Sequence, residues 1–153
     1  VILVVVSQIS EKQKIDFLTI FTMVIDISLI LLMTNFLNLL DLRPGKTIKF
    51  FILFSLLLIN LITRLWIYFL PLFIILIPYT YYELKRKIML GDSGANILGV
   101  ILGYGFSLWT SLPGKLFLLF SLFILTIVSE KYSFTEYIAR NNFLNWLDKL
   151  GRE

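Results

Sequence analysis

The sequence contains no cysteine and no histidine among its 153 residues. Without cysteine the chain cannot form disulfide bonds or a thiolate metal site. Without histidine it lacks the usual proton carrier at neutral pH and the commonest protein ligand of metal ions. These absences exclude a disulfide-stabilised fold, a cysteine-based metal centre and proton transfer by a histidine of this chain.

Charged residues are also scarce. They make up 16% of the chain, whereas 58% of the residues are hydrophobic and the mean hydropathy is +0.88. Soluble domains have about 25% charged and roughly 45–50% apolar residues, and a chain of this length cannot hide so many large apolar side chains from water. The composition therefore predicts a membrane protein. The net charge of +4 does not indicate nucleic-acid binding, because the basic residues lie in short segments between apolar runs.

Five apolar runs are candidates to cross a bilayer, which requires about 20 apolar residues in a helix. They are Phe17–Leu40, Phe50–Ile62, Leu65–Tyr82, Ala95–Trp109 and Lys115–Val128. We expect an all-α fold, a single membrane domain over residues 1–153 built as a polytopic transmembrane bundle of about five spans. The shortest runs leave a tilted or re-entrant segment open as an alternative.

The distribution of lysine and arginine predicts the orientation. Ten of the 14 basic residues lie in residues 41–49, in residues 83–94 or in the tail from Ser129, and only four lie in the opposite set of connections. Basic residues are enriched in cytoplasmic loops. These loops and the tail are therefore expected on the cytoplasmic side of the cell membrane.

The two ends of the sequence suggest further features. Val1–Ser7 resembles the last turns of a helix whose beginning is missing, so the chain is expected to be the C-terminal half of a longer protein. In the tail, residues 129–153, apolar side chains recur at helical spacing from Phe143 to Leu150. This pattern predicts an amphipathic helix in the membrane interface, with a plain solvated tail as the alternative.

A first polar cluster follows the first apolar run. Its candidate site residues are Asn35, Asn38, Asp41, Arg43 and Lys46. At 100° per residue the two asparagines and the aspartate fall within an arc of about 120° at the end of one helix. They would direct three polar groups to the cytoplasmic mouth of the bundle. The alternative is an ordinary helix end followed by a Pro-Gly turn.

A second cluster, Gly91-Asp92-Ser93-Gly94, precedes the fourth apolar run. Glycines on both sides of Asp92 allow a phosphate or a metal ion to approach the backbone. The following helix offers free N–H groups to an anion, and a carboxylate there can hold a Mg²⁺ that bridges phosphate oxygens. Alternatively, Asp92 or Ser93 only caps a helix that begins near Ala95.

Together the two clusters resemble the motifs of a known enzyme family, the polyprenyl-phosphate N-acetylhexosamine-1-phosphate transferases, which include phospho-N-acetylmuramoyl-pentapeptide transferase. The matching residues are Asn35-x-x-Asn38-Leu39-x-Asp41 and Gly91-Asp92-x-Gly94. The resemblance implies a Mg²⁺-dependent membrane enzyme that moves a phospho-sugar from a UDP-N-acetylhexosamine to a polyprenyl phosphate and releases UMP. It covers about the C-terminal half of the family's length.

Carried over by position, the resemblance makes Asp92 the metal ligand and Asp41 a second catalytic aspartate. It places Asn38 beside the nucleotide, and the other substrate-binding candidates are Asn35, Arg43, Lys46, Gly91 and Gly94. We expect the chain alone to be inactive, with the site completed by a missing N-terminal half or by a second copy.

The sequence departs from the family pattern at several positions. Asp41 is followed by Leu42 and Arg43, where the family continues Asp-Gly-x-Asp-Gly, and Met89 replaces an aromatic residue three places before Asp92. The family's Asp-Asp pair and its histidine-bearing loop are both absent. These departures indicate a divergent branch with altered recognition of the base or sugar.

Asp26 lies about nine residues into the first run, where an ionised carboxylate inside a membrane would cost about 2.5–3.5 kcal/mol or more. We expect Asp26 to be protonated or to face the protein interior, bonded to a neighbouring Ser, Thr or Asn. The rival function uses this residue instead. In it, the chain is an inactive homologue or a small transport or structural subunit.

Overall fold

The computed structural model describes residues 16–41, 44–58 and 66–131, and every regular element in these ranges is an α-helix. In chain order the helices are α2 (Phe17–Leu40), α3 (Lys46–Leu57), α5 (Trp66–Leu84), α6 (Gly91–Trp109) and α7 (Leu112–Lys131). The predicted all-α fold class is confirmed for this part of the chain. The N-terminal run Val1–Ser7 and the tail helix predicted beyond α7 lie outside the described residues.

The helix boundaries show where hydropathy alone misplaces the start of a helix. α2 covers its predicted range, but α3 begins at Lys46 instead of Phe50 and α6 begins at Gly91 instead of near Ala95. Both first turns contain polar or small residues, which a hydropathy scan assigns to a loop. The predicted loops 41–49 and 83–94 are shorter as a result, and Glu83 belongs to the last turn of α5.

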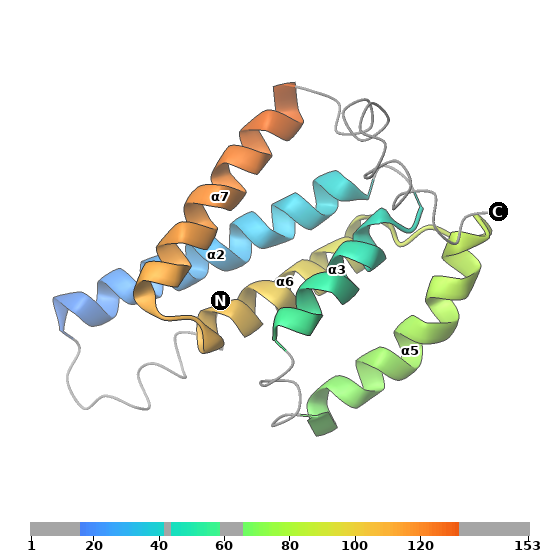
Figure 1. Ribbon diagram of the computed structural model, residues 1–153, viewed down its shortest axis with the longest axis horizontal. Coiled ribbons are helices and arrows are strands. Elements are labelled where there is room, and N and C mark those ends of the chain that lie inside the picture. The colour runs from blue at the N-terminus through green and yellow to red at the C-terminus, as the bar shows by residue number, and fades with distance from the viewer. Residues whose placement is uncertain (1–15, 42–43, 59–65, 132–153) are drawn as a thin grey trace.

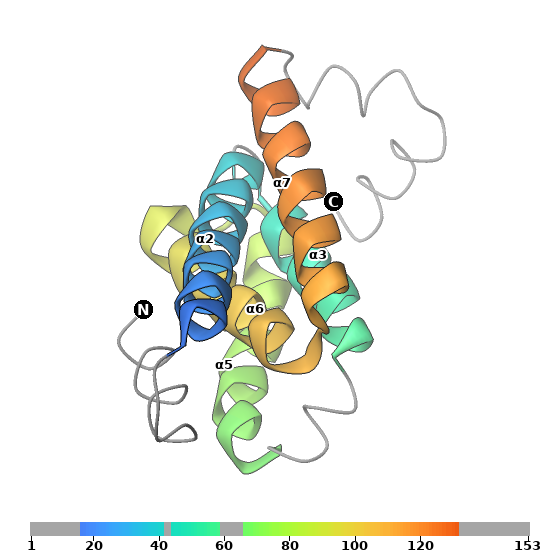
Figure 2. The same ribbon diagram turned by 90° about the vertical axis from the view of Figure 1, so that its left-hand side faces the viewer.

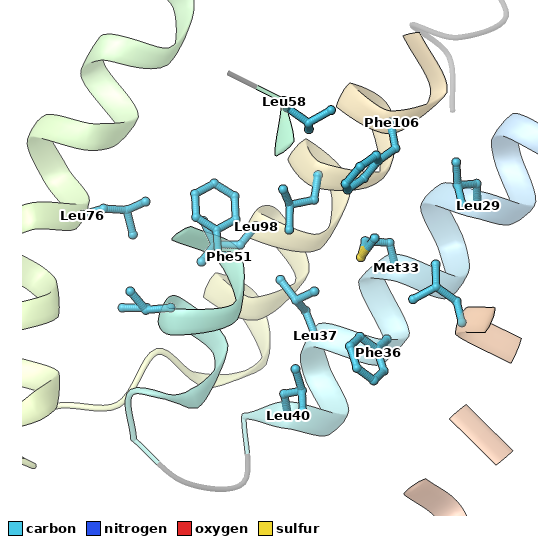
Figure 3. Packing of buried hydrophobic residues seen from close by; sticks show 13 residues of the cluster. Leu29, Met33, Phe36, Leu37, Leu40, Phe51, Leu58, Leu76, Leu98 and Phe106 are labelled. Atoms are coloured by element: carbon cyan, nitrogen blue, oxygen red, sulfur yellow. The ribbon is translucent and has the colours of Figure 1, made fainter. Parts of the chain in front are cut away.

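The hydrophobic core lies among α2, α3 and α6. Leu29, Met33 and Leu37 form one stripe along α2, four residues apart, and all three are fully buried. Figure 3 shows these side chains facing Phe51 of α3 and Phe106 of α6. Apolar residues at this spacing share one helix face. The core therefore orders the three helices that lead into and out of the polar clusters.

α2 and α6 approach each other more closely than ordinary side chains would allow (Figure 1). A Cβ atom built on Gly99 would lie 2.5 Å from the Cα of Thr34, and one built on Gly103 would lie 2.7 Å from the Cα of Ile30. Ala95, one turn earlier on the same face, is fully buried. Ala95, Gly99 and Gly103 thus form a small-residue face through which α6 packs on α2, because only residues without bulk let two helix backbones touch.

The remaining two helices pack less completely. α7 contacts α2 and then diverges from it, so that its C-terminal end projects beyond the other helices in both views (Figures 1 and 2). α5 carries Pro71 and Pro78 and stands apart in Figure 1. The buried residues in its described part are Leu76 and Glu83. In the described part of α5, Leu72, Phe73 and Tyr79 also pack against the core as partly buried side chains.

Of the described helices, only α2 is both long and apolar enough to cross a bilayer, and core helices of soluble proteins or signal sequences share that property. Shorter apolar stretches occupy Leu70–Leu84 of α5 and Leu112–Val128 of α7. The described part of the chain is thus all-helical. The lengths of its helices do not support the predicted bundle of five spans.

Candidate functional site

Four helix ends meet at one end of the bundle. The C-terminal ends of α2 and α5 and the N-terminal ends of α3 and α6 converge there (Figure 1). Within this group the backbone N–H of Gly91 lies near enough to the carboxylate of Asp41 to lower its pKa, and the charge of Asp92 acts on the same carboxylate to raise it. The two polar clusters, far apart in the sequence, are therefore close together in the fold.

Asp41 is buried at the end of α2, with 5% of its surface exposed. The hydroxyl of Thr47, in the first turn of α3, donates to Asp41 Oδ1 at 3.2 Å. Burial raises the pKa of Asp41 above its usual value, and the negative charge of Asp92 adds to the rise, while the hydrogen bonds from Thr47 and Gly91 oppose it. The ionised form of Asp41 is therefore less favourable in the folded protein than in the unfolded chain.

We expect Asp41→Asn to stabilise the protein at neutral pH. A carboxyl group with a raised folded pKa contributes stability that is complete below the unfolded pKa and is lost as the pH rises through the folded value. Asparagine keeps an oxygen that accepts from Thr47 but has no charge to bury. The free energy of unfolding should rise by about 1 kcal/mol at pH 7, and the gain should vanish below about pH 4.

Thermal unfolding of both proteins in the same detergent across this pH range measures the effect. Ser93→Ala, a neutral change at an exposed position, is the control and should show no pH-dependent difference from the parent. A gain for Asp41→Asn that is equal at both ends of the range would contradict the assignment to a buried charge.

Asp92 lies in the first turn of α6 with its side chain exposed. The N-cap position belongs to Leu90, and no side chain caps this helix end. The alternative in which Asp92 or Ser93 caps a helix starting near Ala95 is therefore wrong, because the helix begins before both. Asp92 remains next to free N–H groups of a helix start, where negative charge is favourable.

The two glycines of the second cluster differ in their surroundings. Gly91 has a φ of +68°, which favours glycine, and a Cβ built on it would have no atom within 4 Å. A Cβ built on Gly94 would meet the Leu90 side chain at 2.6 Å. A ligand could thus approach the backbone at Gly91. At Gly94 the Leu90 side chain occupies the space that a side chain would need.

Sequence reasoning missed Glu83. Its side chain is completely buried, and its Oε1 accepts a hydrogen bond of 2.8 Å from the backbone N–H of Gly45. Gly45 has a φ of +85°, so the turn needs glycine here. The available signal was an acidic residue at the end of an apolar run, just before the basic residues from Lys85 to Lys87.

The other predicted substrate-binding residues have mixed positions. Asn35 is exposed on α2, while Asn38 is half-buried and its side-chain oxygen has no hydrogen-bond partner within the ranges the structure covers. Lys46, the first residue of α3, is 8% exposed. Arg43 lies outside the described residues. Asn38 and Lys46 therefore lie at the end of the bundle where the four helix ends meet, and Asn35 lies one helical turn away from it.

Metal binding depends on the carboxylates. Among residues 16–41, 44–58 and 66–131, no group of three His, Cys, Asp or Glu side chains could hold a metal ion. Mg²⁺ in phosphate-transferring sites is usually held by one or two carboxylates together with substrate phosphates. An exposed Asp92 within electrostatic range of Asp41 fits that smaller donor set.

Asp26 has a partner that the sequence did not reveal. Its Oδ1 lies 2.7 Å from Nζ of Lys115 in the first turn of α7, and the two side chains are 1% and 12% exposed. Asp26 faces the interior, as predicted. The prediction that its partners would be neutral overlooked Lys115, because this lysine was placed at the edge of an apolar run.

The motifs that carry the family resemblance therefore share one end of the bundle, where Gly91 and Asp92 lie near enough to Asp41 to influence its pKa. Shared location of motifs does not by itself assign a family, because similar sites occur on unrelated chains. Comparison of the chain with protein-family models, curated proteins and solved structures found no match.

Proposed function

We propose that this chain is a multi-pass membrane protein of the phospho-sugar transferase type. It transfers a phospho-N-acetylhexosamine from a UDP-sugar to a polyprenyl phosphate at the cytoplasmic face and releases UMP. The observation that carries the proposal is the closeness of the two sequence clusters that this chemistry would use. The backbone N–H of Gly91 and the charge of Asp92 both lie near enough to the Asp41 carboxylate to influence its pKa.

The surface of the helices supports a membrane location. Large apolar side chains face outward on α5 and α7, among them Ile77 at 72%, Phe117 at 71% and Phe120 at 64% exposure. Soluble monomers rarely expose extended apolar patches. We infer that lipid covers these faces, and that α3, α5, α6 and α7 cross or enter the bilayer beside α2.

The proposed reaction needs groups that bind and orient two phosphate-containing molecules. An oxygen of the carrier phosphate attacks the β-phosphorus of the UDP-sugar, and the bond from that phosphorus to the bridging oxygen breaks, so UMP leaves. A phosphate dianion is already a competent nucleophile, which makes a histidine base unnecessary. The N–H groups in the first turn of α6 would hold the anions, and Lys46, buried at the start of α3, would add positive charge to this end of the bundle.

Asp92 is the residue that would hold Mg²⁺, with Asp41 behind it adding negative charge. A bound Mg²⁺ supplies neutralisation of the pyrophosphate charge. Asp41 itself accepts a hydrogen bond from Thr47 of α3 and lies beside Gly91 at the start of α6.

The rival function, in which Asp26 serves transport, receives less support. The ion pair with Lys115 gives Asp26 a structural role at the junction of α2 and α7. We therefore favour the transferase. A second copy or a further part of the protein would complete the site, and no nucleic acid is involved.

The proposal is tested by sidedness and product release together. The chain has no cysteine, so single cysteines can be introduced cleanly. Lys87 and Ser111 are exposed at opposite ends of α6, whereas Lys46 and Lys115 are too buried for labelling. We expect an impermeant thiol reagent to label Ser111→Cys but not Lys87→Cys in intact cells.

In membranes that contain the protein as its gene encodes it, UMP should be released from a UDP-N-acetylhexosamine only when both Mg²⁺ and polyprenyl phosphate are added. Labelling of Lys87→Cys from outside would contradict the orientation. Absence of UMP release with every UDP-N-acetylhexosamine would refute the transferase reaction.

A further inference from the structure

The last turns of α5 reach both loops of the candidate site. Glu83 accepts the N–H of Gly45, in the turn that follows Asp41, at 2.8 Å. One helical turn earlier, the hydroxyl of Tyr79 donates to the carbonyl oxygen of Met89, three residues before Asp92, also at 2.8 Å. Residues four apart lie on one face of a helix, so a single face of α5 holds two segments of different motifs.

The complete burial of Glu83 makes its hydrogen bond with Gly45 important for the stability of the fold. A carboxylate without exposed surface is costly unless the fold gives it hydrogen bonds. Glu83 does not join Asp41 and Asp92 in a three-carboxylate metal group within the described part of the chain. Its contact with Gly45 fixes a left-handed turn, and α3 starts directly after that turn. This geometry indicates that Glu83 holds a backbone segment and does not bind a ligand.

We propose that Glu83 and Tyr79 are positioning residues. From α5 they set the separation of two segments, the turn at Gly45 that follows Asp41 and the segment at Met89 that leads into α6 and Asp92. The role in catalysis rests on the proposed transferase function, but the structural role does not. Among the described side chains of α5, Leu76 is the other buried one. Loss of the Glu83 or Tyr79 contact should therefore release the segment that it holds.

Distance measurements test the structural part directly. Spin labels on Ile52→Cys of α3 and Lys87→Cys of the α5–α6 connection, both exposed positions, report the separation of the two loops in the otherwise cysteine-free chain. We expect a narrow distance distribution in the parent and a shifted, broader one in Glu83→Ala and in Tyr79→Phe. Tyr82→Phe, at an exposed tyrosine of the same helix, should leave the distribution unchanged.

Glu83→Gln serves as the conservative variant, because its amide oxygen still accepts from Gly45. It should restore the parent distribution, and with Tyr79→Phe it decides the matter even if Glu83→Ala does not fold. In the UMP assay kcat should fall on the order of 10- to 100-fold for Glu83→Ala and Tyr79→Phe, with little change in KM, because misplaced groups lose rate.

The outcomes separate the two proposals. Unchanged distance distributions in Glu83→Ala and Tyr79→Phe would overturn the positioning role, whatever the activity. Altered distributions in a protein that releases no UMP would refute the transferase and leave the positioning role standing. Altered distributions with an unchanged kcat would show that the loops move without affecting the reaction, which overturns the catalytic part.

Discussion

Asp92→Asn should abolish Mg²⁺-dependent UMP release while the protein stays folded. The change removes an anionic ligand but keeps the size of the side chain. Metal ions supply several kcal/mol of transition-state stabilisation, so the loss should be on the order of 1,000-fold. Stability should fall by only about 0.5 kcal/mol, the contribution of a negative charge near a helix N-terminus, because Asp92 does not occupy the N-cap position.

Titration of UMP release against Mg²⁺ concentration measures this effect. Ser93→Ala, the neighbouring position in the same exposed turn, should retain nearly full activity. If Asp92→Asn worked at the parental rate and with the parental Mg²⁺ dependence, the metal site would be disproved. Gly91-Asp92-Ser93-Gly94 would then be a structural helix start.

Lys115→Met should destabilise the protein by about 3 kcal/mol or more, because it leaves the buried carboxylate of Asp26 without its cation. The two charged groups are 2.7 Å apart and join α2 to α7. We expect the double variant Asp26→Leu and Lys115→Met to regain most of the loss, since an apolar pair of similar volume can replace a buried ion pair. Equilibrium unfolding in detergent micelles gives the free energies.

Lys87→Met removes an exposed lysine and is the matched control, with an expected change within about 0.5 kcal/mol. Equal stability of Lys115→Met and Lys87→Met would show that the ion pair contributes nothing. The double variant also discriminates between functions. It should still release UMP if the transferase proposal holds, whereas a transport role of Asp26 requires that its function be lost.

The sequence predicts the helical elements well where apolar residues run without interruption. α2 has neither glycine nor proline, and its predicted range agrees with the structure at both ends. The starts of α3 and α6 could not be predicted by hydropathy, because Lys46, Thr47, Asp92 and Ser93 are polar residues in first turns. Among the described helices, α2 is the one whose length and hydropathy suit a membrane span.

For the site, the sequence supplied the two motifs but not the contacts that join them. The closeness of Gly91 and Asp92 to Asp41 depends on how α6 packs against α2. The burial of Glu83 and its bond to Gly45 depend on how α5 packs, 38 residues away in the chain. The pairing of Asp26 with Lys115 likewise depends on the approach of two distant helices, which local patterns do not encode.

The contact of Gly99 with the backbone of Thr34 acts as a pivot close to the site. Asp92 lies seven residues away along α6, a lever of about 10 Å at about 1.5 Å per residue. A tilt of about 5° around this pivot would displace the carboxylate by about 1 Å, an error that can cost on the order of 100-fold in rate. The close backbone contact at Gly99 therefore determines how precisely the Asp92 carboxylate is placed. A side chain added at Gly99 should therefore slow the proposed transfer, although Gly99 lies in the contact between α6 and α2.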